Sequence, residues 1–291
     1  MTSPELELAR GAVRDSFEKA SAAYDAHAVL QTRVRNLLLE RITDMTPAPR
    51  IIIDAGAGTG QASRALQRRF RQSLVVALDL AEGMLRAARA QQSWWRRFAR
   101  ACADLENLPL RDATADLVFS NLALQWMTAP DRAFGEAARV LRPDGWFYFT
   151  TFGPATLNEL RAAWAGVDGC THVNQFFDMH DIGAALARSG FVDPVLDVEH
   201  FTLAYADLRT LMHDLKAIGA HNVTAGRPRG LTGRRRLLAV GQAYEAFRKD
   251  GRLPATYEVI FGRARAGAAR RAQNGAPPEI RIPVSQILRR P

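Results

Sequence analysis

The stretch that most constrains the fold is residues 51–60, an apolar β-branched run that ends in an acid and a glycine-rich turn. An uninterrupted apolar run is typical of a strand buried on both faces of a parallel sheet. The next segment, residues 61–70, has the apolar spacing of a helix. Glycines permit a tight turn and let a ligand approach bare backbone at the start of that helix. Strand, glycine turn and helix predict the first unit of a nucleotide-binding α/β sheet.

The glycines of this turn, Gly56, Gly58 and Gly60, are spaced G-x-G-x-G. Dinucleotide-binding turns have G-x-G-x-x-G and hold pyrophosphate at the helix N-terminus. Here the strand ends in Asp54, whose carboxylate would repel phosphate and suit a cationic ligand. The arrangement resembles the D-x-G-x-G-x-G loop of S-adenosylmethionine-dependent methyltransferases with the doubly wound fold. On its own, such a loop leaves an ordinary turn as an equal alternative.

The composition fits one large α/β domain with an insertion. A chain of 291 residues that is 47% hydrophobic can bury a substantial core. No apolar run approaches the roughly 20 residues of a membrane span, and residues 1–10 lack a signal-peptide apolar segment. Two cysteines, Cys102 and Cys170, make a disulfide framework unexpected and favour a cytoplasmic location. The net charge of +9 reflects either arginine bias in the sequence or an acidic partner.

Two further predicted strands also end in acids. Residues 74–79 end in Asp79, 19 residues after Gly60, which is about where the ribose-binding acid of a nucleotide fold lies. That carboxylate could accept hydrogen bonds from both ribose hydroxyls, or it could only cap the following helix. The third strand, residues 101–105, carries Asp104, which could accept a hydrogen bond from the adenine amino group.

Residues 116–121 and 146–152 read as the fourth and fifth strands. The residues that leave the fourth strand, 121–126, would lie at the carboxyl edge, where ligands bind in open α/β sheets. Strands separated by helices at this interval imply right-handed parallel connections. We therefore predict an α/β fold with a doubly wound, Rossmann-like sheet.

One helix is predicted before the first strand, over residues 13–42. Within it, Tyr24, His27 and Gln31 have i, i+3, i+7 spacing and would share a face. The helix either packs on the sheet or forms a flap over the cofactor, where Tyr24 and Gln31 would offer polar tips to a carboxylate.

The C-terminal half predicts an insertion and a tail. Strands are expected from residue 190 to about 201 and over 254–263, separated by helical segments 206–220 and 233–249. This insertion, residues 205–253, would fold over the ligand edge as a lid. Residues 1–264 would form the methyltransferase domain, and 265–291 a basic, mobile tail.

Four more stretches resemble the malonyl-acyl-carrier-protein O-methyltransferases of biotin synthesis. They are FEKASAAYD (17–25) with His27, Leu30 and Gln31, SNLALQW (120–126), TFGPATLNEL (151–160) and LKAIGAHN (215–222). The resemblance covers roughly residues 13–263. It implies methyl transfer from S-adenosyl-L-methionine to the free carboxylate of a malonyl thioester, which primes pimeloyl and biotin synthesis. It also implies an antiparallel last strand, no metal, and an acyl carrier protein as partner.

The residues expected to bind the cofactor come from the glycine loop, the acidic strand ends, the flap and the fourth strand. They are Tyr24, Gln31, Asp54, Gly56, Ala57, Gly58, Gly60, Asp79, Leu80, Met84, Asp104, Leu105, Asn121, Leu122, Gln125 and Trp126. Among them, Leu80 and Met84 would cover the adenine ring.

The implied reaction needs no general base, because a malonyl carboxylate is already ionised at pH 7. Proximity, alignment and exclusion of water would supply the catalysis. An arginine fork suits the carboxylate oxygen that does not attack, and aromatic walls favour a sulfonium. The candidates for positioning the acceptor are Tyr24, Phe152, Arg161, His221, Arg227 and Arg229. Each of them could instead belong to the core or to the solvated surface.

The predicted lid is strongly basic, with ten Lys or Arg and four acids between residues 205 and 253. An acidic carrier protein could dock there, on Arg234, Arg235 and Arg236, although solvated helix faces would give the same count. Nucleic acid is not expected, since no aromatic stacking platform accompanies the charge. Two other functions remain open on the same fold: methylation of another small acceptor, such as a quinone precursor or free acid, and a protein-directed assembly factor.

Overall fold

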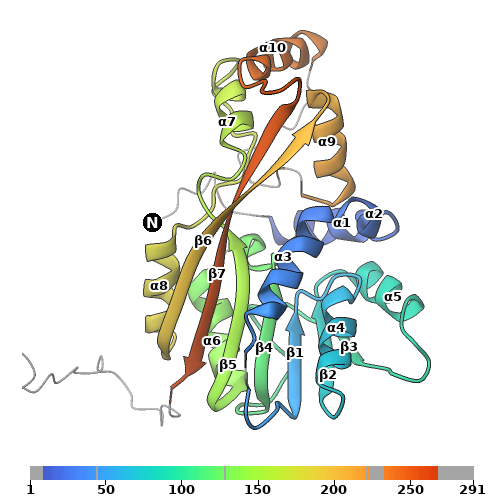
Figure 1. Ribbon diagram of the computed structural model, residues 1–291, viewed down its shortest axis with the longest axis vertical. Coiled ribbons are helices and arrows are strands. Elements are labelled where there is room, and N and C mark those ends of the chain that lie inside the picture. Colours follow the sequence, from blue (N-terminus) through green and yellow to red (C-terminus); the bar gives the residue numbers. More distant parts are fainter. Residues whose placement is uncertain (1–8, 44, 128, 221, 223–232, 268–291) are drawn as a thin grey trace, which may run out of the picture.

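The computed structural model describes residues 9–43, 45–127, 129–220, 222 and 233–267. Within them, one sheet has the strand order β3-β2-β1-β4-β5-β7-β6 (Figure 1). Its strands are β1 (Ile51–Ala55), β2 (Leu74–Asp79), β3 (Ala99–Cys102), β4 (Ala115–Asn121), β5 (Leu141–Phe152), β6 (Phe191–Tyr205) and β7 (Leu253–Ala266). Strands β1 to β5 pair in parallel, and β7 is antiparallel to both neighbours. The predicted doubly wound sheet with an antiparallel last strand is confirmed.

Helices cover both faces of this sheet. Those in the described residues are α1 (Arg10–Ala20), α2 (Tyr24–His27), α3 (Val29–Glu40), α4 (Gln61–Arg69), α5 (Glu82–Ala90), α6 (Pro130–Val140), α7 (Asn158–Ala165), α8 (Met179–Arg188), α9 (Leu208–Ala217) and α10 (Arg234–Glu245), with a short 3-10 helix at Leu124–Trp126. None of these helices is long and apolar enough to cross a membrane.

The apolar run of β1 explains why both faces are covered. Side chains alternate along a strand, so Ile52 and Ile53 point to opposite faces, and both are fully buried. Ile52 joins a hydrophobic cluster with α3 and α4, whereas Ile53 joins a second cluster with α6 and α8. The sheet is therefore the middle layer of three, which places its carboxyl edge at the surface as the natural ligand edge.

Strands β6 and β7 extend beyond the carboxyl ends of the other strands, and α7, α9 and α10 gather around this extension (Figure 1). The pair stays in register up to Tyr205 opposite Leu253. Tyr244 of α10 is fully buried and donates its hydroxyl to the Pro254 carbonyl oxygen at 2.7 Å. Leu211 of α9 and Tyr244 belong to the same cluster as α3. The predicted two-helix insertion thus lies between β6 and β7 and continues one face of the core; its role as a lid stays a prediction.

Several predicted boundaries are wrong. The single helix over residues 13–42 is three helices, because residues 21–23 form a turn and Ala28 leaves the helical region at φ −81°, ψ 44°. Strand β3 lies two residues earlier than predicted, so Asp104 follows it rather than ending it. Strand β5 begins at Leu141, ahead of the predicted start at residue 146, and its pairing with β4 contains a register shift. Strands β6 and β7 are longer than predicted because they extend beyond the sheet.

Candidate functional site

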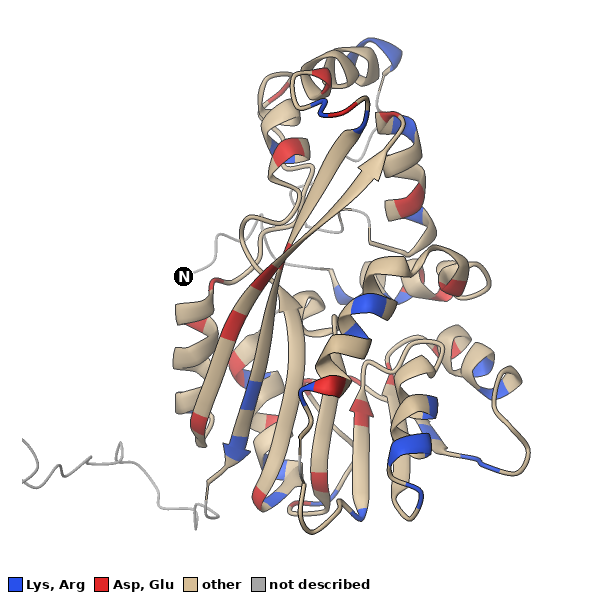
Figure 2. Ribbon diagram, viewed as in Figure 1, with Lys and Arg blue, Asp and Glu red and all other residues tan. Residues whose placement is uncertain are grey.

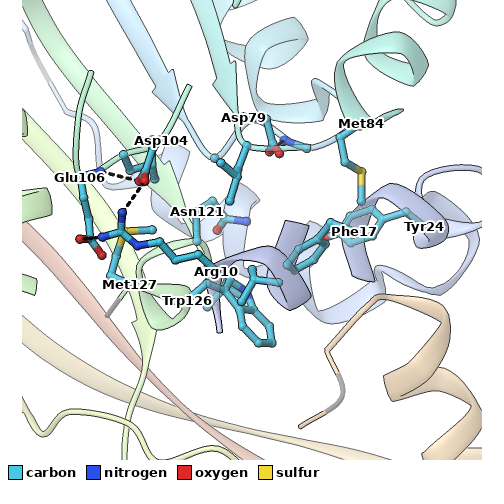
Figure 3. Close-up of a pocket in the computed structure, with 17 residues that line it drawn as sticks. Arg10, Phe17, Tyr24, Asp79, Met84, Asp104, Glu106, Asn121, Trp126 and Met127 are labelled. Carbon is cyan, nitrogen blue, oxygen red and sulfur yellow. Dashed lines mark hydrogen bonds and ion pairs between the residues drawn. The ribbon is translucent and has the colours of Figure 1, made fainter. Parts of the chain in front are cut away.

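A pocket of about 730 Å³, part of it open to solvent, lies at the carboxyl ends of β1, β2 and β4, under α1 and α2 (Figure 3). Of the predicted cofactor residues, those that line it are Tyr24, Gly56, Gly58, Asp79, Leu80, Met84, Asp104, Leu105, Asn121, Leu122 and Trp126. Residues from four strand ends and the flap therefore meet in one cavity, as the spacing of the acids and glycines predicts. The lining is mainly apolar, with a few convergent polar groups, which is the usual character of a small-molecule site.

The glycine loop lets backbone form one wall of this pocket. Gly56 has φ +77°, and its N–H donates to the Leu78 carbonyl oxygen at 2.8 Å. A Cβ at Gly56 would lie 2.2 Å from the Ala123 Cβ, which is far inside contact distance. Gly60, at φ +74°, begins α4, and a Cβ there would lie 2.8 Å from Phe98 Cζ. Both positions therefore need glycine for conformation and for space.

Asp79 is fixed at the pocket wall by backbone donors. Its two carboxylate oxygens accept from Gly58 N at 2.8 Å and Ala81 N at 2.9 Å. Burial raises the pKa of Asp79, while these hydrogen bonds oppose the shift. The carboxylate thus joins the glycine loop to the start of α5 and keeps the remaining lone pairs for a ligand.

Asp54 does not line the pocket. Its side chain is 1% exposed and accepts from Ser63 Oγ of α4 at 2.5 Å. Burial raises the pKa of Asp54 to about 7, against the effect of the Ser63 hydrogen bond. The expected contact of this carboxylate with a cationic ligand is thus replaced by a buried link between β1 and α4, one layer behind the glycine loop.

Four more of the predicted cofactor residues lie outside the pocket lining. Ala57 and Gly60 form the back of the loop. The Gln31 carbonyl oxygen accepts from Asn121 Nδ2 at 3.1 Å, and Gln125 Nε2 donates to the Leu122 carbonyl oxygen at 2.6 Å. The Oε1 atoms of both glutamines are buried and have no hydrogen-bond donor among the described residues. These two glutamines hold pocket residues in place from behind.

Sequence reasoning missed six lining residues, of which Arg10 matters most. They are Arg10, Val13, Phe17, Glu106, Ala123 and Met127. Arg10 extends from the start of α1 across the pocket, with Nη1 2.8 Å from Asp104 Oδ2, and it also pairs with Glu106 (Figure 3). Asp104, predicted to accept from an adenine amino group, is thus paired with an arginine. Of the six, Phe17 and Ala123 lie inside family stretches quoted above and so carried a signal in the sequence.

Aromatic side chains close the flap side of the pocket. The Phe17 ring meets Trp126 edge-on at 5.3 Å between centroids and Tyr24 at 6.5 Å. Burial and then the carboxylate of Asp79 raise the pKa of Tyr24 well above its usual value, so the phenol stays a neutral hydroxyl. Asp25, next to it, accepts from Thr59 Oγ1 at 2.5 Å and Gln61 Nε2 at 2.7 Å. Asp25 thereby ties α2 to the glycine loop and positions Tyr24.

Two of the predicted positioning residues, Phe152 and Arg161, are described by the structure and do not line this pocket. Phe152 is buried against Phe176 and Tyr257. The Arg161 guanidinium donates to the carbonyl oxygens of Pro154, Thr156 and Asn174, so backbone occupies it. The remaining candidates, His221, Arg227 and Arg229, lie outside the described residues.

Arg234, Arg235 and Arg236 are exposed at the start of α10, where Figure 2 shows a basic stretch at the tip of the molecule. Arg236 Nη1 lies 3.7 Å from Asp168 Oδ2. The three arginines therefore face solvent, as a docking surface requires.

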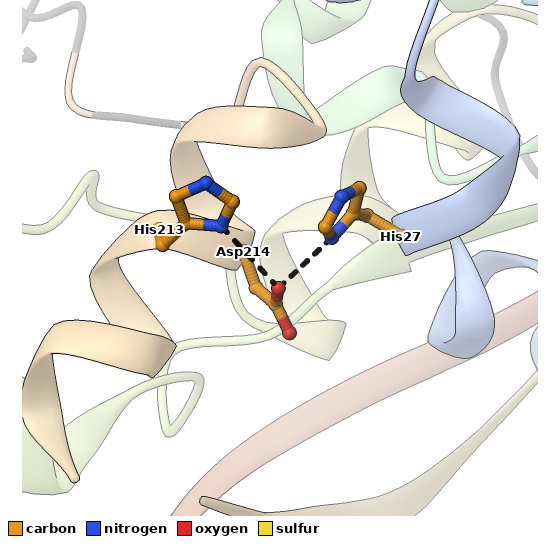
Figure 4. Close-up of side chains that lie close together, drawn as sticks. All are labelled: His27, His213 and Asp214. Atoms are coloured by element: carbon orange, nitrogen blue, oxygen red, sulfur yellow. Dashed lines mark hydrogen bonds and ion pairs between the residues drawn. The ribbon is translucent and has the colours of Figure 1, made fainter.

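The flap and α9 meet at a small polar cluster, shown in Figure 4. His27 Nδ1 of α2 lies 2.9 Å from Asp214 Oδ1 of α9, and His213 Nδ1 lies 4.0 Å from the same oxygen. Their potential ligand atoms all lie within 4.8 Å of one another, close enough for a metal ion. This cluster links α2 to α9 of the insertion. His27 therefore faces α9, and the prediction that Tyr24, His27 and Gln31 share a face is wrong.

The sequence is similar to those of known methyltransferases. A methyltransferase domain family matches residues 53–149. A malonyl-[acyl-carrier protein] O-methyltransferase from Laribacter hongkongensis is 52% identical over 266 residues, covering 89% of this chain and 90% of its own. One of the same name from Methylovorus sp. is 52% identical over 270 residues, with 91% of each chain covered.

Solved structures share the fold at low sequence identity. The YcgJ protein from Bacillus subtilis has a TM-score of 0.57 at 14% identity, covering 82% of this chain and 100% of its own. Phosphoethanolamine N-methyltransferase 2 from Haemonchus contortus, in complex with S-adenosyl-L-methionine, has a TM-score of 0.54 at 16% identity, covering 88% of this chain and 60% of its own.

Proposed function

The chain belongs to the malonyl-[acyl-carrier protein] O-methyltransferase family, and from that premise we propose that it methylates the free carboxylate of a malonyl thioester. The methyl donor is S-adenosyl-L-methionine, and the product is the malonyl methyl ester that primes pimeloyl and biotin synthesis. The observation that carries the proposal is the pocket at the glycine loop, where bare backbone and the Asp79 carboxylate meet.

The pocket fits the cofactor on two counts. Gly56 leaves backbone uncovered where any side chain would collide with Ala123. Asp79 offers acceptor lone pairs for ribose hydroxyls, beside Leu80 and Met84 as an apolar cover for a purine. We assign the ribose to Asp79 and the methionine part to the Gly56–Gly58 backbone.

The acceptor needs positioning more than activation. S-adenosyl-L-methionine supplies an electrophilic methyl group on a sulfonium. A carboxylate acceptor is ionised at pH 7, so no residue has to remove a proton. We propose that Tyr24, as a neutral donor at the pocket, orients the acceptor carboxylate, while Phe17 and Trp126 exclude water. Proximity and alignment of this kind are worth on the order of 7–11 kcal/mol of barrier.

We further propose that the helices between β6 and β7 act as a lid and that Arg234, Arg235 and Arg236 dock an acidic acyl carrier protein. Their exposure and the absence of close acids other than Asp168 among the described residues support this role. Both cysteines are exposed and unpaired, which suits a reducing compartment such as the cytoplasm.

A labelled-methyl assay tests the function. Purified protein with methyl-labelled S-adenosyl-L-methionine should label malonyl-carrier protein as a base-labile ester. Acetyl-carrier protein, which lacks the free carboxylate, is the matched acceptor and should remain unlabelled. Label on free malonate or a quinone precursor alone would indicate a different small acceptor, and no label on any acceptor would favour a non-catalytic assembly factor.

A further inference from the structure

A second cleft lies between α1 and α9, beside the pocket. It encloses about 1100 Å³, part of it open to solvent. Small side chains line much of it: Ala12 and Ala20 of α1, Ala23 just before α2, and Ala217 of α9. Because these side chains are small, the cleft has room for an extended, flexible chain.

The cleft is also where the lysines of the protein gather. Of 39 Lys and Arg, three are lysine: Lys19, Lys216 and Lys249. Lys19 comes from α1 and Lys216 from α9, and both line this cleft. Within the described residues, neither ammonium group has an ion-pair or hydrogen-bond partner. Asp15, also in the lining, is balanced by Arg14 Nη2 at 2.9 Å. An arginine-rich chain therefore presents two unpaired lysine charges at one place.

Lysine is a compact point charge that binds phosphate without demanding a planar, bidentate partner. Two such charges from different elements suit a single phosphate group that bridges them. His213, in the same lining, adds a further hydrogen-bond donor.

The inner end of the cleft adjoins the cofactor pocket across one helix. On α1, Val13 and Phe17 line the pocket, while Ser16 and Lys19 line the cleft. Gly219, just after α9, packs against this point: a Cβ on it would lie 3.2 Å from Phe17 Cδ1 and 3.3 Å from the Ser16 carbonyl oxygen. The cleft and the pocket thus adjoin on the two sides of α1, and a chain lying in the cleft enters the pocket by displacing the contact between Gly219 and Phe17.

We propose that this cleft holds the phosphopantetheine arm of the malonyl thioester, with its phosphate between Lys19 and Lys216. The inference rests on the proposed function and names the part of the acceptor that the function leaves unplaced. The small alanine walls receive the arm, and the lysines fix its outer end at a set distance from the pocket.

The test compares two acceptors that differ by one phosphate: malonyl-4′-phosphopantetheine and malonyl-pantetheine. The parent enzyme should have a lower KM for the phosphorylated acceptor, by roughly three- to tenfold, the combined effect of two exposed charge pairs. The double variant Lys19→Ala, Lys216→Ala should lose that preference while keeping its KM for malonyl-pantetheine. Lys19→Arg with Lys216→Arg should restore most of it, and Lys249→Ala, the remaining lysine, should behave as the parent.

Two outcomes would overturn the inference. A parent that uses both acceptors equally well would exclude phosphate recognition, yet its activity would leave the proposed function standing. A double variant that loses activity on both acceptors alike would show that the lysines support the fold or the chemistry, a result checked by its circular dichroism and cofactor affinity. Failure of the parent on malonyl-carrier protein itself would instead remove the proposed function, and the inference with it.

Discussion

The strand-end pocket and the helices around the β6–β7 extension are built in different ways. On the strand side of the pocket, main-chain atoms and short side chains at fixed strand ends form the wall, as with Gly56 and Asp79. In the extension, helices pack by large side chains such as Tyr244 and leave charged residues facing solvent. The difference teaches that the geometry of the sheet can set the proposed cofactor site, whereas the proposed docking of the acceptor uses helices added to the sheet. Substitutions in the pocket should therefore change cofactor affinity, and substitutions of the exposed charges of the extension should change acceptor kinetics.

The largest expected effect comes from Gly56→Ala. The added Cβ would lie 2.2 Å from the Ala123 Cβ, at a backbone with φ +77°. Overpacking together with left-handed strain should lower the free energy of unfolding by about 3 kcal/mol. Gly58→Ala is the matched control, because φ is +53° but nothing lies within 4 Å of its Cβ position; it should cost about 1 kcal/mol. Urea unfolding of both variants measures this, and equal losses would contradict the packing explanation.

The second largest effect is expected from Asp79→Ala, which should weaken cofactor binding. The variant loses the carboxylate that accepts from Gly58 N and Ala81 N and that we assign to the ribose. Charge-assisted hydrogen bonds are worth roughly 1.5–3 kcal/mol each, so affinity for S-adenosyl-L-methionine should fall by about ten- to a hundredfold. Tyr244→Phe, in the extension, should leave that affinity unchanged. Calorimetry that finds the two variants alike would break the separation between the regions.

Tyr244→Phe itself should affect stability alone. Its hydroxyl donates to the Pro254 carbonyl oxygen at 2.7 Å inside the core, and removal leaves that acceptor without this donor. The free energy of unfolding should fall by about 1 kcal/mol. A thermal-melt series with and without S-adenosyl-L-methionine checks this: the cofactor should raise the melting temperature of variant and parent equally.

The smallest effect is expected at the basic start of α10. Replacing Arg234, Arg235 and Arg236 by Ala should lower kcat/KM for malonyl-carrier protein by roughly two- to fivefold at low salt, because exposed charges mainly steer encounter. The deficit should shrink as ionic strength rises. Malonyl-pantetheine, which has no carrier protein, is the control acceptor and should react at the parental rate. A deficit of the same size on this acceptor would place the arginines in the chemistry instead of the docking.

The sequence predicted the sheet and most of the pocket because both follow from short-range patterns. Asp79, Gly56 and Asn121 are placed by strand ends, and strand ends are readable from apolar runs and glycine turns. Asp54 was misplaced because alternation along β1 turns its side chain to α4, a detail that depends on where the strand ends relative to Gly56. Arg10 was missed because its reach to Asp104 depends on how α1 crosses the sheet, which no local pattern records. Phe152 and Arg161 have the residue types of a site, but Phe152 packs against Tyr257 of β7, and backbone carbonyls around α7 occupy Arg161.

The buried carboxyl of Asp54 couples ligand binding to the release of protons. With a pKa raised to about 7 by burial, this group is partly protonated near neutral pH. A sulfonium bound in front of the loop would favour its ionised form, so uptake of S-adenosyl-L-methionine should release a fraction of a proton, and affinity should rise as pH increases towards 7 and level off above it. S-adenosyl-L-homocysteine has a neutral sulfur and should release less. The heat of binding should depend on the ionisation enthalpy of the buffer, and this dependence should differ between the two ligands. The relative affinity for S-adenosyl-L-methionine and S-adenosyl-L-homocysteine would then change with pH.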